Sequence, residues 1–237
     1  MAPLRTQPRQ AQAPLSLTPE LISRSHPKRV DEDRGGTGLA SEEEVTASLD
    51  AFLVGTQGDS LWLFAYGSLM WRPDLDFTEQ RVARLRGWHR RFCLWQWRFR
   101  GTPERPGLML ALDRGGSCVG VTYKVVGPDL RAKVMPVWRR EMRGRGYRPR
   151  YVLARTPEGP VRALTFVANR EGQRYAGRLS DAEIAQRIAL ACGPTGPSAE
   201  YLLNTVAHCE RLGIHDRHLW RLQALVAEWM HTTADAC

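Results

Sequence analysis

Two short segments of the chain carry residues whose types and spacing could do chemistry. The first is Tyr66-Gly67-Ser68-Leu69, which follows an apolar run. Glycine lets a chain bend without a β-carbon clash, so successive backbone N–H groups can point into one concavity and bind an oxyanion or a carboxylate. A Gly-Ser pair after a strand also occurs in ordinary turns. The residue types alone therefore leave an anion-binding turn and a purely structural turn both open.

The second segment is centred on Glu141, which lies among four arginines and precedes Gly144, Gly146 and Tyr147. A carboxylate within reach of a reacting group can act as a general acid or base. A carboxylate with so many basic neighbours in sequence is also typical of a surface ion pair. Both interpretations of Glu141 are open at this point.

Other catalytic and ligand-binding patterns are missing from the sequence. The six histidines form no His-Glu-x-x-His motif, and the five cysteines form neither a Cys-x-x-Cys pair nor the spacing of a zinc site. There is no glycine-rich phosphate loop and no Gly-x-Ser-x-Gly elbow, and Ser68 has no evident base partner. The sequence therefore predicts neither a metal nor a cofactor. The odd number of widely spaced cysteines indicates a reducing compartment.

Particular elements must position the two candidate segments. Residues 61–66 form a short apolar run between Gly58 and Gly67, which predicts a buried strand that ends at the glycine turn. Residues 129–143 place apolar side chains near helical spacing, with Pro136 as an obstacle. A kinked or interrupted helix is therefore predicted to carry Glu141. Whether that helix faces the turn does not follow from the sequence.

Further strands are predicted beside these segments. Residues 81–100 mix β-branched, aromatic and arginine residues with approximate alternation, which predicts one long or two short strands. Tryptophan and arginine alternate in residues 88–100 and could stack nucleobases, but aromatic residues in a strand more often belong to the core. Two hairpins are also predicted. They consist of strands 108–112 and 119–126 around Gly115-Gly116-Ser117, and strands 151–154 and 161–167 around Pro157-Glu158-Gly159.

Helices are predicted before and after the strands, from capping residues and glycine ends. Two of them span residues 19–24, with Thr18 as the N-cap, and residues 42–53, with a capping box of Ser41 and Glu44. Three more are predicted in the last third of the chain: from Ser180 to about Gly193, from Ser198 to about Gly213, and from Asp216 to about Met230. Because the strands come first and most helices last, the order of elements indicates an α+β fold.

Composition and charge restrict the class of protein. The 237 residues are 43% hydrophobic and 25% charged, with a net charge of +9, and the first two values are ordinary for a globular chain. Only three of the 34 basic residues are lysine, and the arginines are spread over nearly the whole length. A nucleic-acid footprint more often clusters its basic residues, whereas a general surplus of positive charge favours an acidic substrate. A basic module that binds nucleic acid or an acidic partner is the alternative.

The ends of the chain suggest its location and its division. Residues 1–14 are rich in Pro, Gln and Arg and are predicted to be disordered. No signal-peptide stretch and no run of about 18 apolar residues occurs, so we expect a cytoplasmic protein without a membrane partner. We predict that residues 1–57 form a partly disordered tail with one or two short helices, and that residues 58–237 form one domain that carries both candidate segments.

Five short motifs occur in order along residues 61–212. They are Phe64-Ala65-Tyr66-Gly67-Ser68-Leu69-Met70-Trp71-Arg72-Pro73, Arg86-Gly87-Trp88-His89-Arg90-Arg91-Phe92, Gly120-Val121-Thr122-Tyr123, Arg140-Glu141 with Gly146-Tyr147, and Gly196-Pro197-Ser198-Ala199-Glu200-Tyr201-Leu202. In order and spacing they resemble the ChaC-type γ-glutamylcyclotransferases. The resemblance implies a small mixed or antiparallel β-barrel with surrounding helices and a helical C-terminal third.

The resemblance also implies an activity and a site. Members of the family cleave glutathione to 5-oxoproline and cysteinylglycine, and neither a metal nor a cofactor is expected. Their Tyr-Gly-Ser-Leu loop binds the γ-glutamyl group, and one glutamate moves the proton. These roles correspond here to Glu141 and to the substrate-binding residues Phe64, Ala65, Tyr66, Gly67, Ser68 and Leu69, although the family commonly has glycine at the position of Ala65.

Two further expectations depend on the same resemblance. Tyr147 and Tyr201 either line the substrate pocket or are buried structural tyrosines. The expected partner is the small molecule glutathione rather than nucleic acid, and other γ-glutamyl amides are the alternative substrates.

Overall fold

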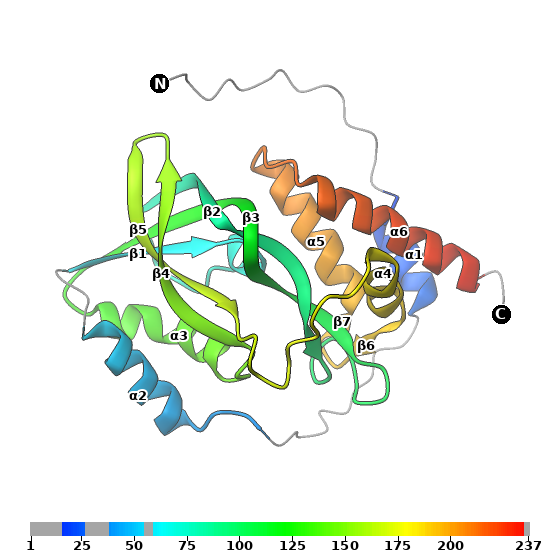
Figure 1. Cartoon of the computed structure of the whole chain (residues 1–237), viewed down its shortest axis with the longest axis horizontal. Coiled ribbons are helices and arrows are strands. Elements are labelled where there is room, and N and C mark those ends of the chain that lie inside the picture. Colours follow the sequence, from blue (N-terminus) through cyan, green and yellow to red (C-terminus); the bar gives the residue numbers. More distant parts are fainter. Residues whose placement is uncertain (1–15, 27–37, 55–58, 235–237) are drawn as a thin grey trace.

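A closed β-barrel lies at the centre of the computed structural model, which describes residues 16–26, 38–54 and 59–234. Its strands follow the order β1-β3-β2-β4-β5, and β1 also pairs with β5 in parallel (Figure 1). They are β1 (Ser60–Ala65), β2 (Glu79–Gln96), β3 (Gly107–Val126), β4 (Tyr147–Thr156) and β5 (Gly159–Ala168). The barrel and its helices confirm the predicted α+β architecture.

The long β2–β3 ribbon corrects one prediction. The chain does not reverse at Gly115-Gly116-Ser117, because β3 runs through these residues and pairs with β2 over nearly its full length. Gly115 and Gly116 have φ of 103° and 65° and lie beside a register shift between Arg86 and Trp88. The glycines therefore let a continuous strand bend. The reversal lies between β2 and β3, whereas the second predicted hairpin, β4–β5, is confirmed.

Helices cover the barrel in two groups (Figure 1). Helices α2 (Glu42–Leu53) and α3 (Leu130–Met142) lie together on one side. On the other side lie α1 (Pro19–Ser25), α4 (Asp181–Leu190), α5 (Ser198–Arg211) and α6 (Arg217–Ala234). The remaining short elements are the 3₁₀ turn η1 (Ser68–Met70) and the strands β6 (Cys192–Gly193) and β7 (Gly196–Pro197). Within the described part of the chain, no helix is long and apolar enough to span a membrane.

The capping residues show where local sequence signals decide a helix start. The capping box at Ser41 is formed as predicted, and Ser180, the predicted helix start, forms a second capping box with Glu183. Asp216 also caps α6, since its carboxylate accepts from the backbone N–H groups of the second and third residues after it. Ser198 is not a cap: Pro197 takes that position, and the Ser198 hydroxyl is buried and donates toward the carbonyl of Leu108. The buried hydroxyl of Ser198 therefore makes a tertiary contact instead of capping the helix.

The hydrophobic core is shared by the barrel and the helices. It includes Leu21 and Ile22 of α1 and Val45 and Leu49 of α2, so both N-terminal helices pack on the same core as the barrel. Trp138 of α3 is fully buried and contacts Phe52 and Phe166. The predicted disorder of residues 1–14 lies outside the described residues.

Candidate active site

Strand β1 delivers the Tyr66 to Leu69 turn to one end of the barrel. Tyr66 follows the last residue of β1, and its hydroxyl donates to the carbonyl of Phe166 on β5 over 2.7 Å. The chain then enters the 3₁₀ turn η1, in which the carbonyls of Gly67 and Ser68 accept hydrogen bonds from residues farther along. The first N–H groups of such a turn have no partner within it. These groups are the donors that an anionic ligand would use.

A buried arginine fixes the backbone of this turn. Arg90 of β2 donates from Nε to the carbonyl of Tyr66 over 2.6 Å, and its guanidinium also pairs with Asp216 at 3.0 Å. The side chain of Arg90 is only 2% exposed. Arg90 belongs to one of the five motifs, but its sequence neighbours contain no signal of this contact.

Glu141 lies in the last turn of α3, and its side chain is only 11% exposed. The interpretation of Glu141 as a surface ion-pair residue is therefore wrong. Burial raises the pKa of its carboxyl above the ordinary value, because a low-dielectric environment disfavours the charge. The guanidinium groups of Arg140 and Arg174 lower the pKa of Glu141, while the carboxylate of Asp74 raises it.

Three tyrosines surround this carboxylate. Burial raises the pKa of Tyr66 and Tyr147 well above the ordinary value, and that of Tyr201 to about 12, with the charge of Glu141 adding to each shift. All three hydroxyls therefore keep their protons near neutral pH. The Tyr147 hydroxyl donates to the carbonyl of Leu110 over 2.8 Å, while the polar groups of Ser68 lower the Tyr201 pKa somewhat.

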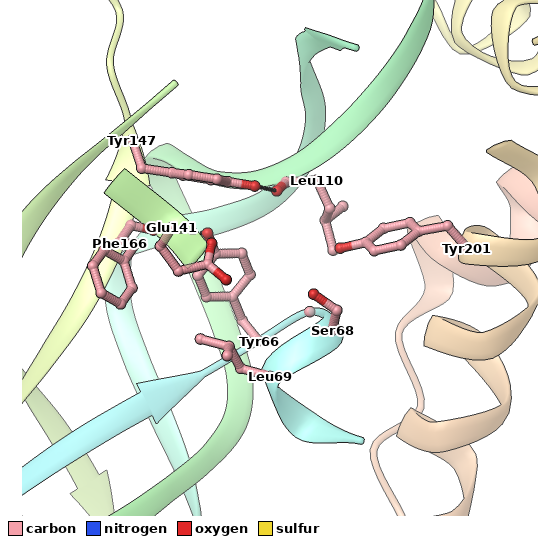
Figure 2. Close-up of a pocket in the computed structure, with 9 residues that line it drawn as sticks. Tyr66, Ser68, Leu69, Leu110, Glu141, Tyr147, Phe166 and Tyr201 are labelled. Atoms are coloured by element: carbon pink, nitrogen blue, oxygen red, sulfur yellow. Dashed lines mark hydrogen bonds between the residues drawn. The ribbon is translucent and has the colours of Figure 1, made fainter. Parts of the chain in front are cut away.

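The turn and Glu141 line one pocket, in which the Glu141 carboxylate points toward the Tyr66 ring and the turn (Figure 2). The pocket contains about 260 Å³ of empty space, part of it open to solvent. Its lining residues are Tyr66, Gly67, Ser68, Leu69, Leu110, Glu141, Tyr147, Phe166 and Tyr201. Seven of these nine were candidates from the sequence. Glu141 is the one carboxylate in this lining, so it is the candidate general acid–base group of the pocket.

The remaining candidates do not line this pocket. Phe64 and Ala65 are fully buried in β1, and the Phe64 carbonyl accepts a hydrogen bond from Thr165. Conversely, Leu110 and Phe166 line the pocket although the sequence did not single them out. They are apolar strand residues like many others in the barrel, so only the tertiary fold distinguishes them.

Two other hollows, of about 600 and 700 Å³ including open solvent, have no acidic residue in their linings. Among the described residues, no group of three or more His, Cys, Asp or Glu side chains could hold a metal ion. In the segment 88–100, Phe92 is buried and Trp88 and Trp95 pack against the core. The core interpretation is confirmed for these three aromatic residues, whereas Phe99 of the same segment is 48% exposed.

Gly67→Ala is expected to lower kcat/KM for the substrate of this pocket by about 10²-fold. An added β-carbon would lie 2.9 Å from the Tyr201 hydroxyl oxygen and 3.6 Å from Leu110 Cδ2, and a displacement of about 1 Å in a site can reduce the rate by that much. Steady-state kinetics measure the effect. Adding Tyr201→Phe removes the crowded oxygen and should restore part of the loss. Wild-type kinetics in Gly67→Ala would show that this close approach is irrelevant.

Known proteins resemble this chain over the region that builds the barrel and the pocket. The family model described as ChaC-like protein matches residues 61–229. A relative from Escherichia coli K12, a glutathione-specific γ-glutamylcyclotransferase, is 38% identical over 180 residues, which are 75% of this chain and 78% of the relative. The human glutathione-specific γ-glutamylcyclotransferase 1 is 34% identical over 167 residues, which cover 68% of this chain and 75% of the human protein.

A solved structure supports the fold. The crystal structure of a selenomethionine-labelled γ-glutamyl cyclotransferase specific to glutathione from yeast superposes with a TM-score of 0.68 at 20% identity. The match covers 74% of this chain and 99% of the yeast chain. It confirms the γ-glutamylcyclotransferase-like fold that the sequence motifs implied. With the family model matching most of its length, the chain belongs to the ChaC-like family.

Proposed function

We propose that this protein is a glutathione-specific γ-glutamylcyclotransferase, a lyase that releases 5-oxoproline and cysteinylglycine. The names of its relatives in bacteria and animals support this activity. The observation that carries the proposal is the burial of Glu141 in the same pocket as the Tyr66 to Leu69 turn. This is the arrangement that a folded γ-glutamyl group requires, with an anion-binding turn at one end and one proton carrier beside it.

The reaction is a ring closure within the substrate. The α-amine of the γ-glutamyl group attacks its own γ-amide carbonyl, the new C–N bond closes the five-membered ring of 5-oxoproline, and the old C–N bond breaks to release the amine of cysteinylglycine. Nucleophile and electrophile belong to one molecule, so the main task of the pocket is to hold the folded conformation. Orientation of this kind can contribute about 7–11 kcal/mol.

Proton transfer is the second task, and it falls to Glu141. The α-amine is protonated near neutral pH and must lose a proton before it attacks, and the departing nitrogen must gain one. A single carboxylate within reach of both nitrogens can accept the first proton and return it to the second. The raised pKa of Glu141 improves this exchange, since a general acid–base group works best when its pKa is near the working pH.

The turn holds the substrate in this scheme. Its backbone N–H groups bind the α-carboxylate of the γ-glutamyl group or the oxyanion that develops on the attacked carbonyl. The turn, Glu141 and the three tyrosine side chains line the pocket, which is open to solvent on one side. In our proposal the γ-glutamyl group lies against these residues, and the cysteinylglycine part extends toward the open side. Discrimination between glutathione and other γ-glutamyl amides then depends on contacts outside the pocket.

Incubation of the purified chain with glutathione tests the proposal. We expect 5-oxoproline and cysteinylglycine in equal amounts, measured by liquid chromatography, and slower release of 5-oxoproline from γ-glutamyl dipeptides and other γ-glutamyl amides. Faster turnover of those compounds would mean that the reaction is as proposed but that the preferred substrate is another γ-glutamyl amide. If no γ-glutamyl compound yields 5-oxoproline, the proposed function is wrong.

We also propose a cytoplasmic location. The four cysteines that the structure describes form no disulfide, as expected for a protein in a reducing compartment. Fractionation of cells that express the chain tests this, and recovery in an oxidising compartment would contradict it.

A further inference from the structure

We propose that Arg140, anchored by Asp74, is a positioning residue that joins the two halves of the active site, the Tyr66 to Leu69 turn and Glu141. The inference rests on the proposed function, because it assigns a role to side chains that border the same pocket. Neither Arg140 nor Asp74 lines that pocket. Both act through the residues that do.

The guanidinium of Arg140 contacts both halves of the site at once. Its Nη2 donates to the hydroxyl oxygen of Ser68 over 2.6 Å, and its Nε lies 3.4 Å from a carboxylate oxygen of Glu141. One planar group therefore spans the turn and the proton carrier. Because the guanidinium is rigid, it fixes the separation of these two groups better than a flexible ammonium could.

Asp74 and the backbone hold the other side of the guanidinium. Nη1 of Arg140 donates to the Asp74 carboxylate over 2.7 Å and to the carbonyl of Arg72 over 2.8 Å. The Arg72 side chain also contacts Asp74, at 3.3 Å. Each nitrogen of the Arg140 guanidinium thus has a partner, which restricts its position from three directions.

The backbone at Asp74 is strained to deliver this carboxylate. Among the described residues, Asp74 and Arg145 are the two non-glycine residues with positive φ, and Asp74 has φ of 48°. A left-handed conformation is unfavourable outside glycine and persists where surrounding contacts hold it. The ion pair with Arg140 is such a contact. Asp74 directly follows the Trp71-Arg72-Pro73 part of the first motif, so the motif extends to the anchor of Arg140.

The charges around Glu141 make the role of Arg140 measurable. Three charged groups act on Glu141: Arg140 of α3, Arg174 of the segment after β5, and Asp74 of the segment after η1. The tyrosines that face Glu141, which are Tyr66, Tyr147 and Tyr201, stay neutral near pH 7. Arg140 lowers the pKa of Glu141, and Asp74 raises it. Removing one charge or the other should therefore move the pKa of Glu141 in opposite directions.

Steady-state kinetics with glutathione between pH 5 and 9 test the inference in three variants. Arg140→Gln should lose about 10²-fold in kcat/KM through misplacement of the turn, and the acidic limb of its pH profile should move to higher pH. Arg140→Lys keeps the charge but cannot contact Ser68 and Asp74 together, so it should lose activity while its acidic limb stays near that of wild type. Asp74→Asn should move the acidic limb to lower pH.

The matched control is Arg139→Gln. Arg139 precedes Arg140 on α3, but it pairs with Glu42 of α2 on the surface, so this variant should keep kcat/KM within about twofold of wild type, as expected for a surface change away from the site. Wild-type kinetics in Arg140→Gln would overturn the inference. Movement of the acidic limb in the same direction in Arg140→Gln and Asp74→Asn would overturn it as well.

A readout without turnover separates this inference from the proposed function. Titration of the Glu141 carboxyl carbon by NMR, assigned through its loss in Glu141→Gln, should give a higher pKa in Arg140→Gln and a lower pKa in Asp74→Asn than in wild type. A wild-type protein that cleaves no γ-glutamyl compound but shows these opposite changes would overturn the proposed function alone. An unchanged titration of Glu141 in both variants would overturn the inference alone.

Discussion

Glu141→Gln is expected to reduce kcat for glutathione cleavage by about 10²- to 10⁴-fold, the usual contribution of a general acid–base group. Glutamine has nearly the same shape and keeps the pocket filled, but it cannot accept the proton of the α-amine. The KM should change little, because the turn rather than Glu141 binds the γ-glutamyl group in our proposal. Steady-state kinetics with 5-oxoproline as the measured product check both values.

The same variant should be more stable than wild type at neutral pH. The pKa of Glu141 is raised in the folded protein by burial, so folding disfavours the ionised carboxylate. This cost is absent below the unfolded pKa, grows as the pH rises through the folded pKa, and is complete above it. Denaturant unfolding at several pH values should therefore show a gain in the free energy of unfolding of Glu141→Gln at pH 7–8 that disappears toward pH 4.

Glu171→Gln provides the matched control for both measurements. The Arg148 guanidinium holds the pKa of Glu171 below its usual value, and the pair lies on the surface, far more exposed than Glu141. Loss of this charge should leave kcat unchanged and give a stability change of the opposite sign, if any is measurable. Full activity of Glu141→Gln would remove Glu141 from the mechanism.

Local signals predicted the helices better than they predicted the barrel. The capping boxes at Ser41 and Ser180 involve residues three positions apart, so the sequence around each start is sufficient. Barrel closure depends on the parallel pairing of β1 with β5, whose partners are far apart in the sequence. The glycines at 115 and 116 suit both a turn and a bend. The long pairing of β3 with β2 favours the bend, and this pairing is a property of the tertiary fold.

The site was predictable in its residue types but not in its assembly. The residue types made the Tyr66 to Leu69 turn and Glu141 possible site residues, and the resemblance to the ChaC-type γ-glutamylcyclotransferases joined them into one site. The residue types could not distinguish a buried Glu141 from a surface one, since four arginines nearby in sequence suit both. The contacts of Arg140 with Ser68 and of Arg90 with the Tyr66 carbonyl join distant segments, and only the fold brings them together.

The second large effect is expected for Arg90→Met, which should lower the free energy of unfolding by about 3 kcal/mol. Removing one partner of a buried ion pair usually costs about 3–5 kcal/mol, and we take the lower end because the Asp216 side chain is 21% exposed. The variant also leaves the carbonyls of Tyr66 and Val119 without the Arg90 donor. Denaturant unfolding measures the loss, and kcat/KM should fall with it because the backbone of the turn is released.

A double-mutant cycle with Asp216→Asn separates the ion pair from the backbone contacts. If the pair matters as proposed, Arg90→Met and Asp216→Asn should be coupled by about 0.5–3 kcal/mol, and Asp216→Asn alone should retain most of the activity, since Arg90 still reaches the Tyr66 carbonyl. Arg84→Met, an exposed change on the same strand, should alter the free energy of unfolding by no more than about 0.5 kcal/mol. Equal decreases in the free energy of unfolding in Arg84→Met and Arg90→Met would mean that the contacts of Arg90 with the Tyr66 to Leu69 turn make no specific contribution to stability.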